Sequence, residues 1–250
     1  MRRAERLDGI LARLASDGSV SVSELTESLD TSPATVRRDL KLLEEQKLLS
    51  RSHGGAVGNG LLYELPVRYR GGQRAEEKGR IADAAVERIA DRQIVGLTGG
   101  TTTTEIARRL RGRTLTVVTN AINIASELVV SETIRLVVTG GVARPQSYEL
   151  IGPLADRTLE DLSVDVAFVG VDGVNAGGAT THDEIEAQTD RKLVERAARV
   201  IVVCDSTKIG RSALSRICTL DEVDELITDV GAPAAELNAL RAAGVEVVRV

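Results

Sequence analysis

The sequence has few aromatic residues and few cysteines, and each shortage excludes a class of function. Its 250 residues include three tyrosines, one phenylalanine and no tryptophan. Proteins that bind single-stranded nucleic acid stack the bases on aromatic rings, so that mode of binding is excluded. Two cysteines, Cys204 and Cys218, supply neither a disulfide framework nor a repeated CxxC zinc pattern. We therefore expect a reduced, cytoplasmic setting.

Long apolar runs are also missing. No run approaches 18 apolar residues, so we expect no membrane span. The first ten residues, MRRAERLDGI, are charged where a secretory signal would be apolar, so we expect no signal peptide. With 42% hydrophobic residues the chain can still bury a sizeable core. The net charge of −5 does not exclude DNA as a partner, because an acidic total can hide a local basic face.

The chain changes character near residues 52–72. Before this segment the apolar residues recur at helical spacing, and after it short Val/Ile-rich runs alternate with helical stretches. The segment itself, SHGGAVGNGLLYELPVRYRGG, is rich in glycine and contains Pro66, which is typical of a boundary. We therefore predict a small helical domain over residues 1–57, a linker over residues 58–75 and an α/β domain over residues 76–250.

Two short helices are predicted at the start of the first domain. Apolar residues recur at helical spacing from Leu7 to Leu14, and Gly18 follows as a stop signal. A second helix fits residues Ser23–Leu29, with Ser23 as its N-cap.

A third helix has the surfaces of a helix that reads DNA. Ser32 can cap it, Pro33 fits its first position, and it is predicted to run to about Lys47. At about 100° per residue, its apolar residues share one face: Val36, Leu40 and Leu43. Its cations lie on the opposite side: Arg37, Arg38 and Lys41. Such a helix can enter a major groove about 12 Å wide, where arginines reach phosphates or guanine edges.

The segment LLSRSHGGAV is predicted to form a hairpin, which would complete a winged helix-turn-helix and add the cation Arg51. The alternative is an ordinary solvated helix face, since residues 1–57 hold nine Lys/Arg and nine Asp/Glu. DNA binding is favoured, because contact with phosphates needs local cations rather than a basic total.

Beyond residue 76, short apolar runs separated by helical stretches predict a mostly parallel sheet covered on both faces. The predicted strands are QIVGL, TLTVVT, IRLVVT, VDVAFVG, RVIVVCD, ELIT and VEVVRV. The predicted helices are EEKGRIADAAVERIA, Thr104–Leu110, AINIASELV and Glu184–Ala198. Ligands of such sheets bind where the strands end, at their carboxyl edge.

Small and polar residues follow five of these strands: Thr98–Thr104, Thr119–Asn120, Thr139–Gly141, Gly170–Gly173 and Asp205–Lys208. Glycines let the backbone approach an anion, while hydroxyls and the N–H groups of a helix N-terminus donate to it. Together the five exits offer donors, a cation and carboxylates, which suits a small phosphorylated polyol. The alternative is that each is an ordinary turn or helix start. Neither a P-loop (GxxxxGK[ST]) nor a Rossmann GxGxxG pattern is present.

The remaining reactive side chains favour structural roles. Cys204 ends an apolar run, which predicts a buried core thiol, and Cys218 has no neighbouring partner in the sequence. His53 and His182 are far apart and lack a ligand set, so no metal site is predicted. Three acids at a predicted helix start favour its dipole, although one could face the ligand pocket: Asp183, Glu184 and Glu186.

The segment SPATVRRDLKLLEEQKLLSRSHGGAV resembles the winged helix-turn-helix signature of the DeoR family of bacterial transcriptional regulators. Family motifs continue in order: EKxxIA at Glu77–Ala82, Gly-Thr-Thr at 100–102, VTN at 118–120, GG at 140–141, FVGVDG at 168–173, GATT at 178–181 and DSTK at 205–208. As an ordered set over nearly the whole chain they are specific. The resemblance implies an α/β protein, with an N-terminal winged helix-turn-helix followed by a mostly parallel α/β sensor domain similar to ribose-5-phosphate isomerase and CoA-transferase folds.

The resemblance also implies a DNA-binding repressor or activator, with repression favoured, that acts on sugar-catabolic genes and is controlled by a phosphorylated sugar or a related metabolite. Its expected partners are a double-stranded DNA operator and further copies of itself, in a homodimer or homotetramer. No catalytic residues, cofactor or metal are expected. Expected DNA contacts are Ser32, Thr35, Arg37, Arg38, Lys41, Arg51 and His53. Expected effector contacts are Thr98, Gly100, Thr101, Thr102, Thr103, Asn120, Gly141, Asp172, Asp205 and Lys208.

Within that set, Thr101 and Thr102 are expected to hold the phosphate, with Lys208 as its cation. Asp172 or Asp205 is expected to accept from sugar hydroxyls. One departure from the family pattern is Thr98, where many members carry aspartate before the Gly-Thr-Thr loop. The loss of that carboxylate changes which hydroxyl pattern an effector should present.

Two other functions compete with this interpretation. The first is a sugar-phosphate isomerase with an accessory domain, suggested by the fold resemblance and by acids at strand ends. Isomerases of this fold carry DGADE where this chain has Asp172-Gly173-Val174-Asn175, so the second acid for proton transfer is missing. The second is a protein-interaction module without DNA, which would be indifferent to Arg38→Ala.

Overall fold

The computed structural model describes residues 3–46, 48–58 and 66–250. The chain divides into two compact units, Met1–Gln73 and Arg74–Val250. Of the predicted linker, residues 59–65 lie outside the described residues, and a short helix follows, α4 (Val67–Arg70). Tyr69 of α4 packs into the core of the first unit. Within the described part of the chain, every helix is too short or too polar to cross a bilayer.

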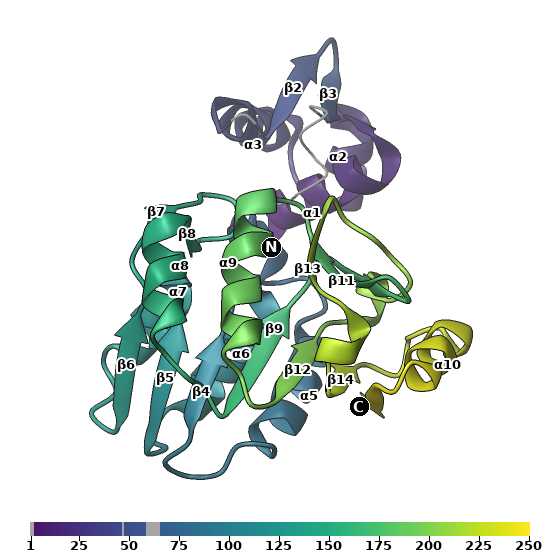
Figure 1. The fold of residues 1–250 in the computed structure, drawn as a ribbon. Helices are drawn as coiled ribbons and strands as arrows, with labels where there is room; N and C mark the ends of the chain where they lie inside the picture. The colour runs from purple at the N-terminus through teal and green to yellow at the C-terminus, as the bar shows by residue number, and fades with distance from the viewer. Residues whose placement is uncertain (1–2, 47, 59–65) are drawn as a thin grey trace. The chain divides into compact units, whose positions relative to one another are not determined.

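The first unit has the three predicted helices and the predicted hairpin (Figure 1). Its elements are α1 (Arg3–Asp17), β1 (Ser19–Ser21), α2 (Val22–Ser28), α3 (Pro33–Glu45), β2 (Leu49–Ser52) and β3 (Gly55–Gly58). The strand β1 was not predicted; it pairs antiparallel with β3, so the sheet order is β1-β3-β2. The core buries the apolar faces of the helices, including Leu11 of α1, Leu25 of α2 and Leu40 of α3.

The predicted N-cap of the second helix is wrong by two residues. The cap is Ser21, whose hydroxyl accepts from the backbone N–H of Glu24 at 3.1 Å. The Glu24 carboxylate in turn accepts from the Ser21 backbone N–H at 3.0 Å. This reciprocal pairing requires a glutamate three residues after the cap, a spacing that Ser21 has and Ser23 lacks.

We expect Ser21→Ala to destabilise the first unit by about 1 kcal/mol, because the cap satisfies an N–H that the helix leaves without a partner. Ser23→Ala is the matched control, because it keeps both bonds between Ser21 and Glu24 and removes only the 3.0 Å contact between the Ser23 and Ser21 hydroxyls. Hydrogen–deuterium exchange of α2 amides in the full chain measures both effects. Equal protection of α2 in the two variants would contradict the assignment of the cap.

The second unit contains a parallel sheet of seven described strands, in the order β15-β14-β12-β9-β4-β5-β6. These strands are β4 (Ile94–Leu97), β5 (Leu115–Thr119), β6 (Ile134–Val138), β9 (Val166–Gly170), β12 (Val200–Val203), β14 (Glu225–Thr228) and β15 (Glu246–Arg249). All seven were predicted as strands, and the parallel pairing follows from the helices that separate them. Strands β4, β9 and β12 are central, so their carboxyl ends lie next to one another.

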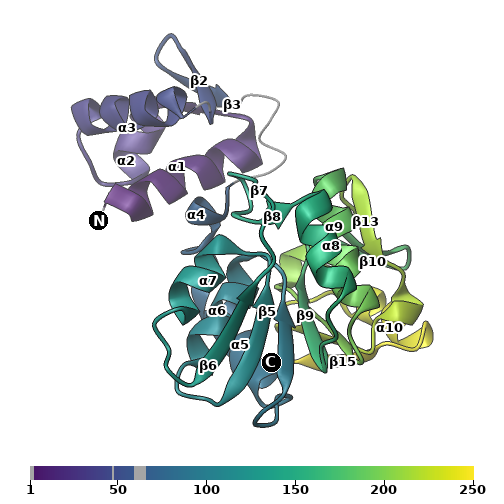
Figure 2. The same ribbon diagram turned by 60° about the vertical axis from the view of Figure 1, so that its left-hand side comes forward.

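Helices cover both faces of this sheet, as Figure 2 shows. The helices are α5 (Ala75–Val86), α6 (Thr101–Leu110), α7 (Ile122–Leu128), α8 (Pro153–Glu160), α9 (Glu184–Glu195) and α10 (Ala234–Ala242). One apolar core contains residues of α5, α6 and α7, and another contains residues of α8, α9 and α10. Cys204 is buried in the second core, as predicted, and its burial raises the pKa of the thiol.

Several elements of this unit were not predicted. They are helices α8 and α10, the antiparallel sheet of β10 (Gly173–Asn175), β11 (Gly178–Thr181) and β13 (Ser215–Cys218), and the pair β7 (Val142–Ala143) and β8 (Leu150–Ile151). Short 3₁₀ turns lie at Ser206–Lys208 and Leu220–Glu222. Helix α6 also begins at Thr101, three residues before its predicted start. The threonine run therefore belongs to the first turn of a helix.

Candidate functional site

The exposed face of α3 is the first candidate surface. Ser32 caps the helix, its hydroxyl accepting from the Thr35 backbone N–H at 3.2 Å, and Pro33 occupies the first turn, both as predicted. The apolar residues Val36, Leu40 and Leu43 are buried. The cations of the opposite face are exposed: Arg37, Arg38 and Lys41. Folding therefore buries one side of α3 and presents the other to solvent.

The hairpin β2–β3 carries the other two predicted residues of this surface. Arg51 is exposed on β2, and its guanidinium lies 3.9 Å from the Glu44 carboxylate. Lys41 lies 3.8 Å from Glu45 on the same helix. Pairs this exposed contribute little free energy, so either cation can exchange its acid for a phosphate. His53, at the exposed turn, lines an open cavity of about 800 Å³ beside α1.

The aspartate within this helix has a role that sequence reasoning missed. Asp39 lies between the exposed arginines and the buried Leu40, yet only 2% of its side chain is exposed. Its carboxylate accepts from Arg6 Nε of α1 at 2.6 Å, and Arg3 lies 3.7 Å away. The pairing ties α3 to α1. No pattern within α3 could have revealed it, because the partner lies 33 residues earlier.

The second candidate site is the carboxyl edge of the parallel sheet, where β4 leads through Gly99–Gly100 into α6. Gly100 has φ +127°, a conformation that L side chains rarely adopt, and no side chain among the described residues caps the helix. The hydroxyls of Thr103 and Thr104 donate back to the Gly100 carbonyl. The first N–H groups of α6 therefore lack a capping side chain among the described residues, and a helix start of this kind can bind an anion.

Thr98 and Asn120 are buried within this edge. The Thr98 hydroxyl accepts from the Gly170 backbone N–H at 2.9 Å, which ties the ends of β4 and β9 together. Asn120, after β5, donates from Nδ2 to Asp190 Oδ1 at 3.2 Å. Gly141 lies against the backbone of Ile151. Thr102 and Thr103 are buried and Thr101 is half-buried, so of the threonine run Thr101 has the most access to solvent at the helix start.

The structure brings Asp172 and Lys208 together from the ends of neighbouring strands. Lys208 Nζ lies 3.4 Å from Asp172 Oδ1, and the Thr181 hydroxyl oxygen lies 3.1 Å from Asp172 Oδ2. His182 Nε2 lies 3.9 Å from the same carboxylate. Asp205 is elsewhere: it lies 3.6 Å from Arg74 Nε and accepts from the Thr207 N–H at 3.0 Å.

Three acids form a buried group at this edge, which we call the carboxylate cluster: Glu149, Glu186 and Asp190. Each offers an oxygen within 4.8 Å of the others, and all three side chains are buried. Burial, reinforced by the charges of Asp190 and Glu186, raises the pKa of Glu149 well above its ordinary value. Burial and the Glu186 charge likewise raise the pKa of Asp190.

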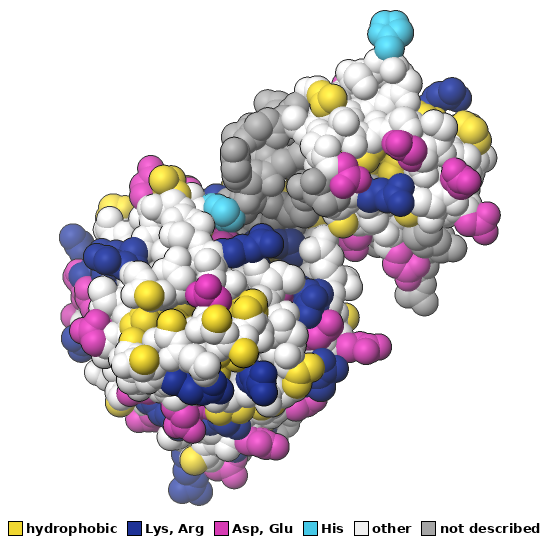
Figure 3. All heavy atoms as spheres, turned by 90° about the vertical axis from the view of Figure 1, so that its right-hand side faces the viewer, with side chains coloured by type: hydrophobic (Ala, Val, Ile, Leu, Met, Phe, Trp, Pro, Cys, Tyr) yellow, Lys and Arg dark blue, Asp and Glu magenta, His cyan; other side chains and the backbone are white. Residues whose placement is uncertain are grey.

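Sequence reasoning found only part of the carboxylate cluster. Glu186 was among the helix-start acids, one of which was predicted to be able to face the effector site, and it is buried against Thr181 and Arg144. Asp183 is the N-cap of α9, as its position suggested. Glu149 and Asp190 were missed, since they lie 41 positions apart and neither belongs to a recognisable motif. Figure 3 shows acidic and basic side chains interleaved on the face that it displays.

Comparison with known families covers both units. A family model described as the DeoR-like helix-turn-helix domain matches residues 6–60, and one described as the DeoR C terminal sensor domain matches residues 73–230.

Curated relatives match over nearly their whole length. A protein of Escherichia coli O157:H7, named for repression of the aga operon, is 39% identical, covering 99% of this chain and 94% of that protein. The transcriptional regulator GlpR of Haloferax volcanii is 38% identical, covering 99% and 98%. The glycerol-3-phosphate regulon repressor of Escherichia coli K12 is 32% identical, covering 96% of each. Among solved structures, ribose 5-phosphate isomerase A of Methanocaldococcus jannaschii matches 54% of this chain and 55% of its own, with 20% identity and a TM-score of 0.41.

Proposed function

The chain belongs to the DeoR family of transcriptional regulators, and from this premise we propose that it represses genes of sugar metabolism until a phosphorylated sugar binds its second unit. Its relatives with near-complete coverage are regulators of transcription, which favours a DNA-binding regulator over the sugar-phosphate isomerase considered above. One of them is named for a glycerol-3-phosphate regulon, and this supports a phosphorylated polyol as the class of effector. We also propose a homodimer or homotetramer as the working assembly, as the family resemblance implies.

The exposed face of α3 supports the proposed operator contacts. Arg37, Arg38 and Lys41 stand clear of the core, on a helix whose apolar side is fully used in packing. A helix of this kind can lie in the major groove, with arginines directed at guanine edges or phosphates. We assign the start of the helix, through Ser32 and Thr35, and the hairpin, through Arg51 and His53, to contacts with the backbone of the DNA.

The uncapped start of α6 is the observation that carries the proposed effector site. Its N–H groups and the partial positive charge of the helix suit a phosphate, which we place against Thr101 and Thr102. The ends of β4 and β9 touch, because the Thr98 hydroxyl bonds Gly170. Asp172 follows two residues later with Lys208 at 3.4 Å, and we propose that this cation and carboxylate border the phosphate position.

We propose that the other predicted effector residues support the site and do not all contact the effector directly. Thr98 and Thr103 shape the loop by hydrogen bonds to Gly170 and Gly100, so we propose that they act on the effector through the backbone. Gly141, in the loop after β6, packs against the backbone of Ile151, and we propose that it borders the site. Asp205 is proposed to hold the strand end in place through Arg74 rather than to touch a sugar.

Titration of effectors against labelled operator tests this function. The full-length protein is bound to fluorescent DNA from its own upstream region, and anisotropy is followed as glycerol 3-phosphate or hexose 6-phosphates are added. We expect at least one phosphate to release the DNA, while the matching unphosphorylated polyols leave it bound. By linkage, that phosphate must bind the DNA-free form more tightly. If no phosphorylated sugar changes the affinity for any upstream DNA, the proposed switch is wrong.

We expect Lys208→Ala to raise the effector concentration needed for release about tenfold, since a hydrogen bond to a charged group contributes about 1.5 kcal/mol. Operator affinity without effector should not change. Lys192→Ala is the matched control, because Lys192 pairs with Glu195 and Glu160 on the outer side of α9. A Lys208→Ala protein that responds to the effector like the wild type would remove Lys208 from the effector site.

A further inference from the structure

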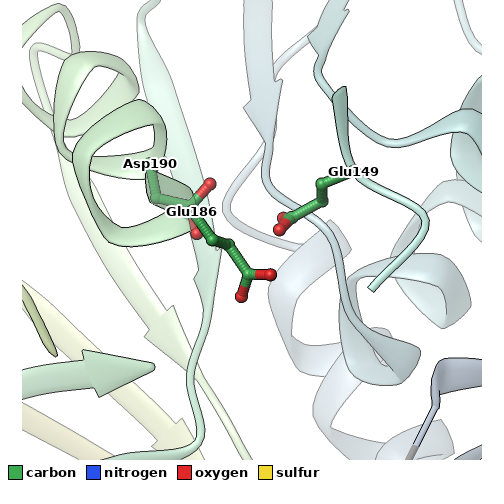
Figure 4. A group of neighbouring side chains, drawn as sticks. All are labelled: Glu149, Glu186 and Asp190. Atoms are coloured by element: carbon green, nitrogen blue, oxygen red, sulfur yellow. The ribbon is translucent and has the colours of Figure 1, made fainter. Parts of the chain in front are cut away.

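The carboxylate cluster joins segments that are distant in the sequence. Glu149 lies just before β8, while Glu186 and Asp190 lie one turn apart on α9. Figure 4 shows the Glu149 side chain extending toward the two acids of α9 from the opposite side. Their oxygens come within 4.8 Å of one another, and the side chain of Glu149 is 1% exposed. Three acids converge at one buried point.

The existing hydrogen bonds leave acceptor capacity unused at that point. Glu149 Oε1 accepts from the Gly99 backbone N–H, while Glu149 Oε2 is buried and no N–H or hydroxyl among the described residues donates to it, although the Glu149 carboxyl lies within hydrogen-bond reach of the Glu186 carboxyl. Glu186 accepts from the Thr181 hydroxyl at 2.6 Å on one oxygen and from Arg144 at 3.1 Å on the other. A carboxylate oxygen has two lone pairs, so both Glu186 oxygens can accept a further contact.

A neutral oxygen completes the set. Asn120 is 3% exposed, and its amide reaches the carboxylate cluster, because Nδ2 donates to Asp190 Oδ1. The carbonyl oxygen of the same amide, Oδ1, is buried without a hydrogen-bond partner among the described residues. A buried amide oxygen that lacks a donor costs about 1–3 kcal/mol. Like Glu149 Oε2, this oxygen is a buried acceptor without a donor among the described residues, and a positively charged group could satisfy both.

The charged residues around the carboxylate cluster are also consistent with a missing cation. Among the described residues, the cation that contacts the carboxylate cluster is Arg144, which also lies 3.1 Å from Asp183. Lys208 is directed to Asp172 instead. If all three acids are ionised, the one shared guanidinium leaves an excess of about two negative charges in a buried place, which either bound protons or a bound cation must offset.

We propose that the carboxylate cluster binds one divalent cation, with Glu149, Glu186 and Asp190 as ligands and the Asn120 carbonyl oxygen as a fourth. An all-oxygen set of carboxylates and an amide suits Mg²⁺, Mn²⁺ or Ca²⁺. The cluster offers neither sulfur nor imidazole, which zinc prefers in structural sites. If Asn120 binds the cation, it does not contact the effector directly, in contrast to our expectation from the sequence.

The cation would act on the loop that begins α6. A Cβ at Gly99 would collide with the Glu149 carboxylate, so this acid packs directly on the backbone of that loop. Binding an ion therefore fixes α9, the segment before β8 and the Gly99–Gly100 turn to one point. The expected consequence is a more stable second unit. Ion binding does not require the effector, and it is measured separately from DNA release, so either can fail without the other.

Calorimetric titration of the full chain tests the site. The protein is first stripped with EDTA and then titrated with MnCl₂, CaCl₂ and MgCl₂, and its melting temperature is measured with and without each ion. We expect one ion per chain and a higher melting temperature, since a ligand that binds only the folded state stabilises it. Glu149→Gln and Asp190→Asn should each weaken binding by more than about tenfold, because even outer partners of a metal site cost that much when lost. Glu132→Gln, an exposed acid of the same unit, should bind like the wild type.

The melting temperatures of the stripped variants separate loss of the site from loss of the fold. Removing one of three neighbouring acids relieves repulsion, so both variants should melt no lower than the stripped wild type. Wild-type protein that binds none of the three ions would overturn the proposal, and so would variants that bind the ion with the affinity of the wild type. If the stripped wild type binds no ion and melts higher at pH 5 than at pH 7, the cluster holds protons instead of a cation, which also overturns it.

Discussion

Replacing Arg38 with alanine should weaken operator binding by about 1–3 kcal/mol, which is roughly five- to 150-fold, if the guanidinium reads a base. Arg37→Ala should have an effect of the same kind. Both side chains are exposed on the face of α3 opposite its buried leucines, so their loss removes contacts with DNA without opening the core. Fluorescence anisotropy with the labelled operator measures the change.

The salt dependence of binding separates the two possible contacts of each arginine. A side chain that contacts only phosphate should weaken operator and unrelated DNA alike, and its removal should reduce the slope of log affinity against log salt by about 1. A side chain that reads a base should weaken the operator selectively. Arg135→Ala, an exposed arginine on β6, is the matched control. Unchanged operator affinity in both α3 variants would exclude this face, and a parallel loss of effector binding would mean that the fold was damaged.

Asp39→Ala should destabilise the first unit by about 2–4 kcal/mol, because removing one partner of a buried ion pair costs about 3–5 kcal/mol and Arg6 keeps some contact with water. Only 2% of the Asp39 side chain and 13% of the Arg6 side chain are exposed. The loss should be seen as faster hydrogen exchange across α1 and α3 in the full chain. Operator affinity should fall with it, since α3 would no longer be held in place.

The partner variants define the origin of this effect. Arg6→Ala should destabilise the same two helices, and the double variant should lose less than the sum of the single losses, because the two residues interact directly. Glu27→Ala, an exposed acid on α2, should change stability by less than about 0.5 kcal/mol. Protection of α1 and α3 that is the same in Asp39→Ala as in the wild type would show that the ion pair is dispensable.

Local patterns predicted much of the first unit. The spacing of Val36, Leu40 and Leu43 indicated which side of α3 is buried, because a helix repeats about every 3.6 residues wherever it lies. Ser32 followed by proline indicated where that helix begins. The same reasoning placed the cap of α2 on Ser23, and it failed because two serines compete and the position of Glu24 decides between them.

In the second unit, apolar runs predicted all the parallel strands, since strands covered on both faces are apolar throughout. The antiparallel sheet of β10, β11 and β13 escaped prediction because its strands are short and polar, with residues such as Thr180 and Arg216 in pairing positions. Helices α8 and α10 are short, and each begins at or just after a proline, Pro153 or Pro233, which in sequence suggests a turn.

The sequence by itself determined the class of fold, the cationic face of α3 and the polar strand ends, because each depends on residues that are near one another along the chain. Only the tertiary structure decided which charges meet. It paired Asp39 with Arg6 and Asp205 with Arg74, and it gathered Glu149, Glu186 and Asp190 into one buried group. The burial of a charge and the identity of its partner depend on segments that are tens of residues apart in the sequence. A local sequence pattern does not show which of these segments come together in the fold.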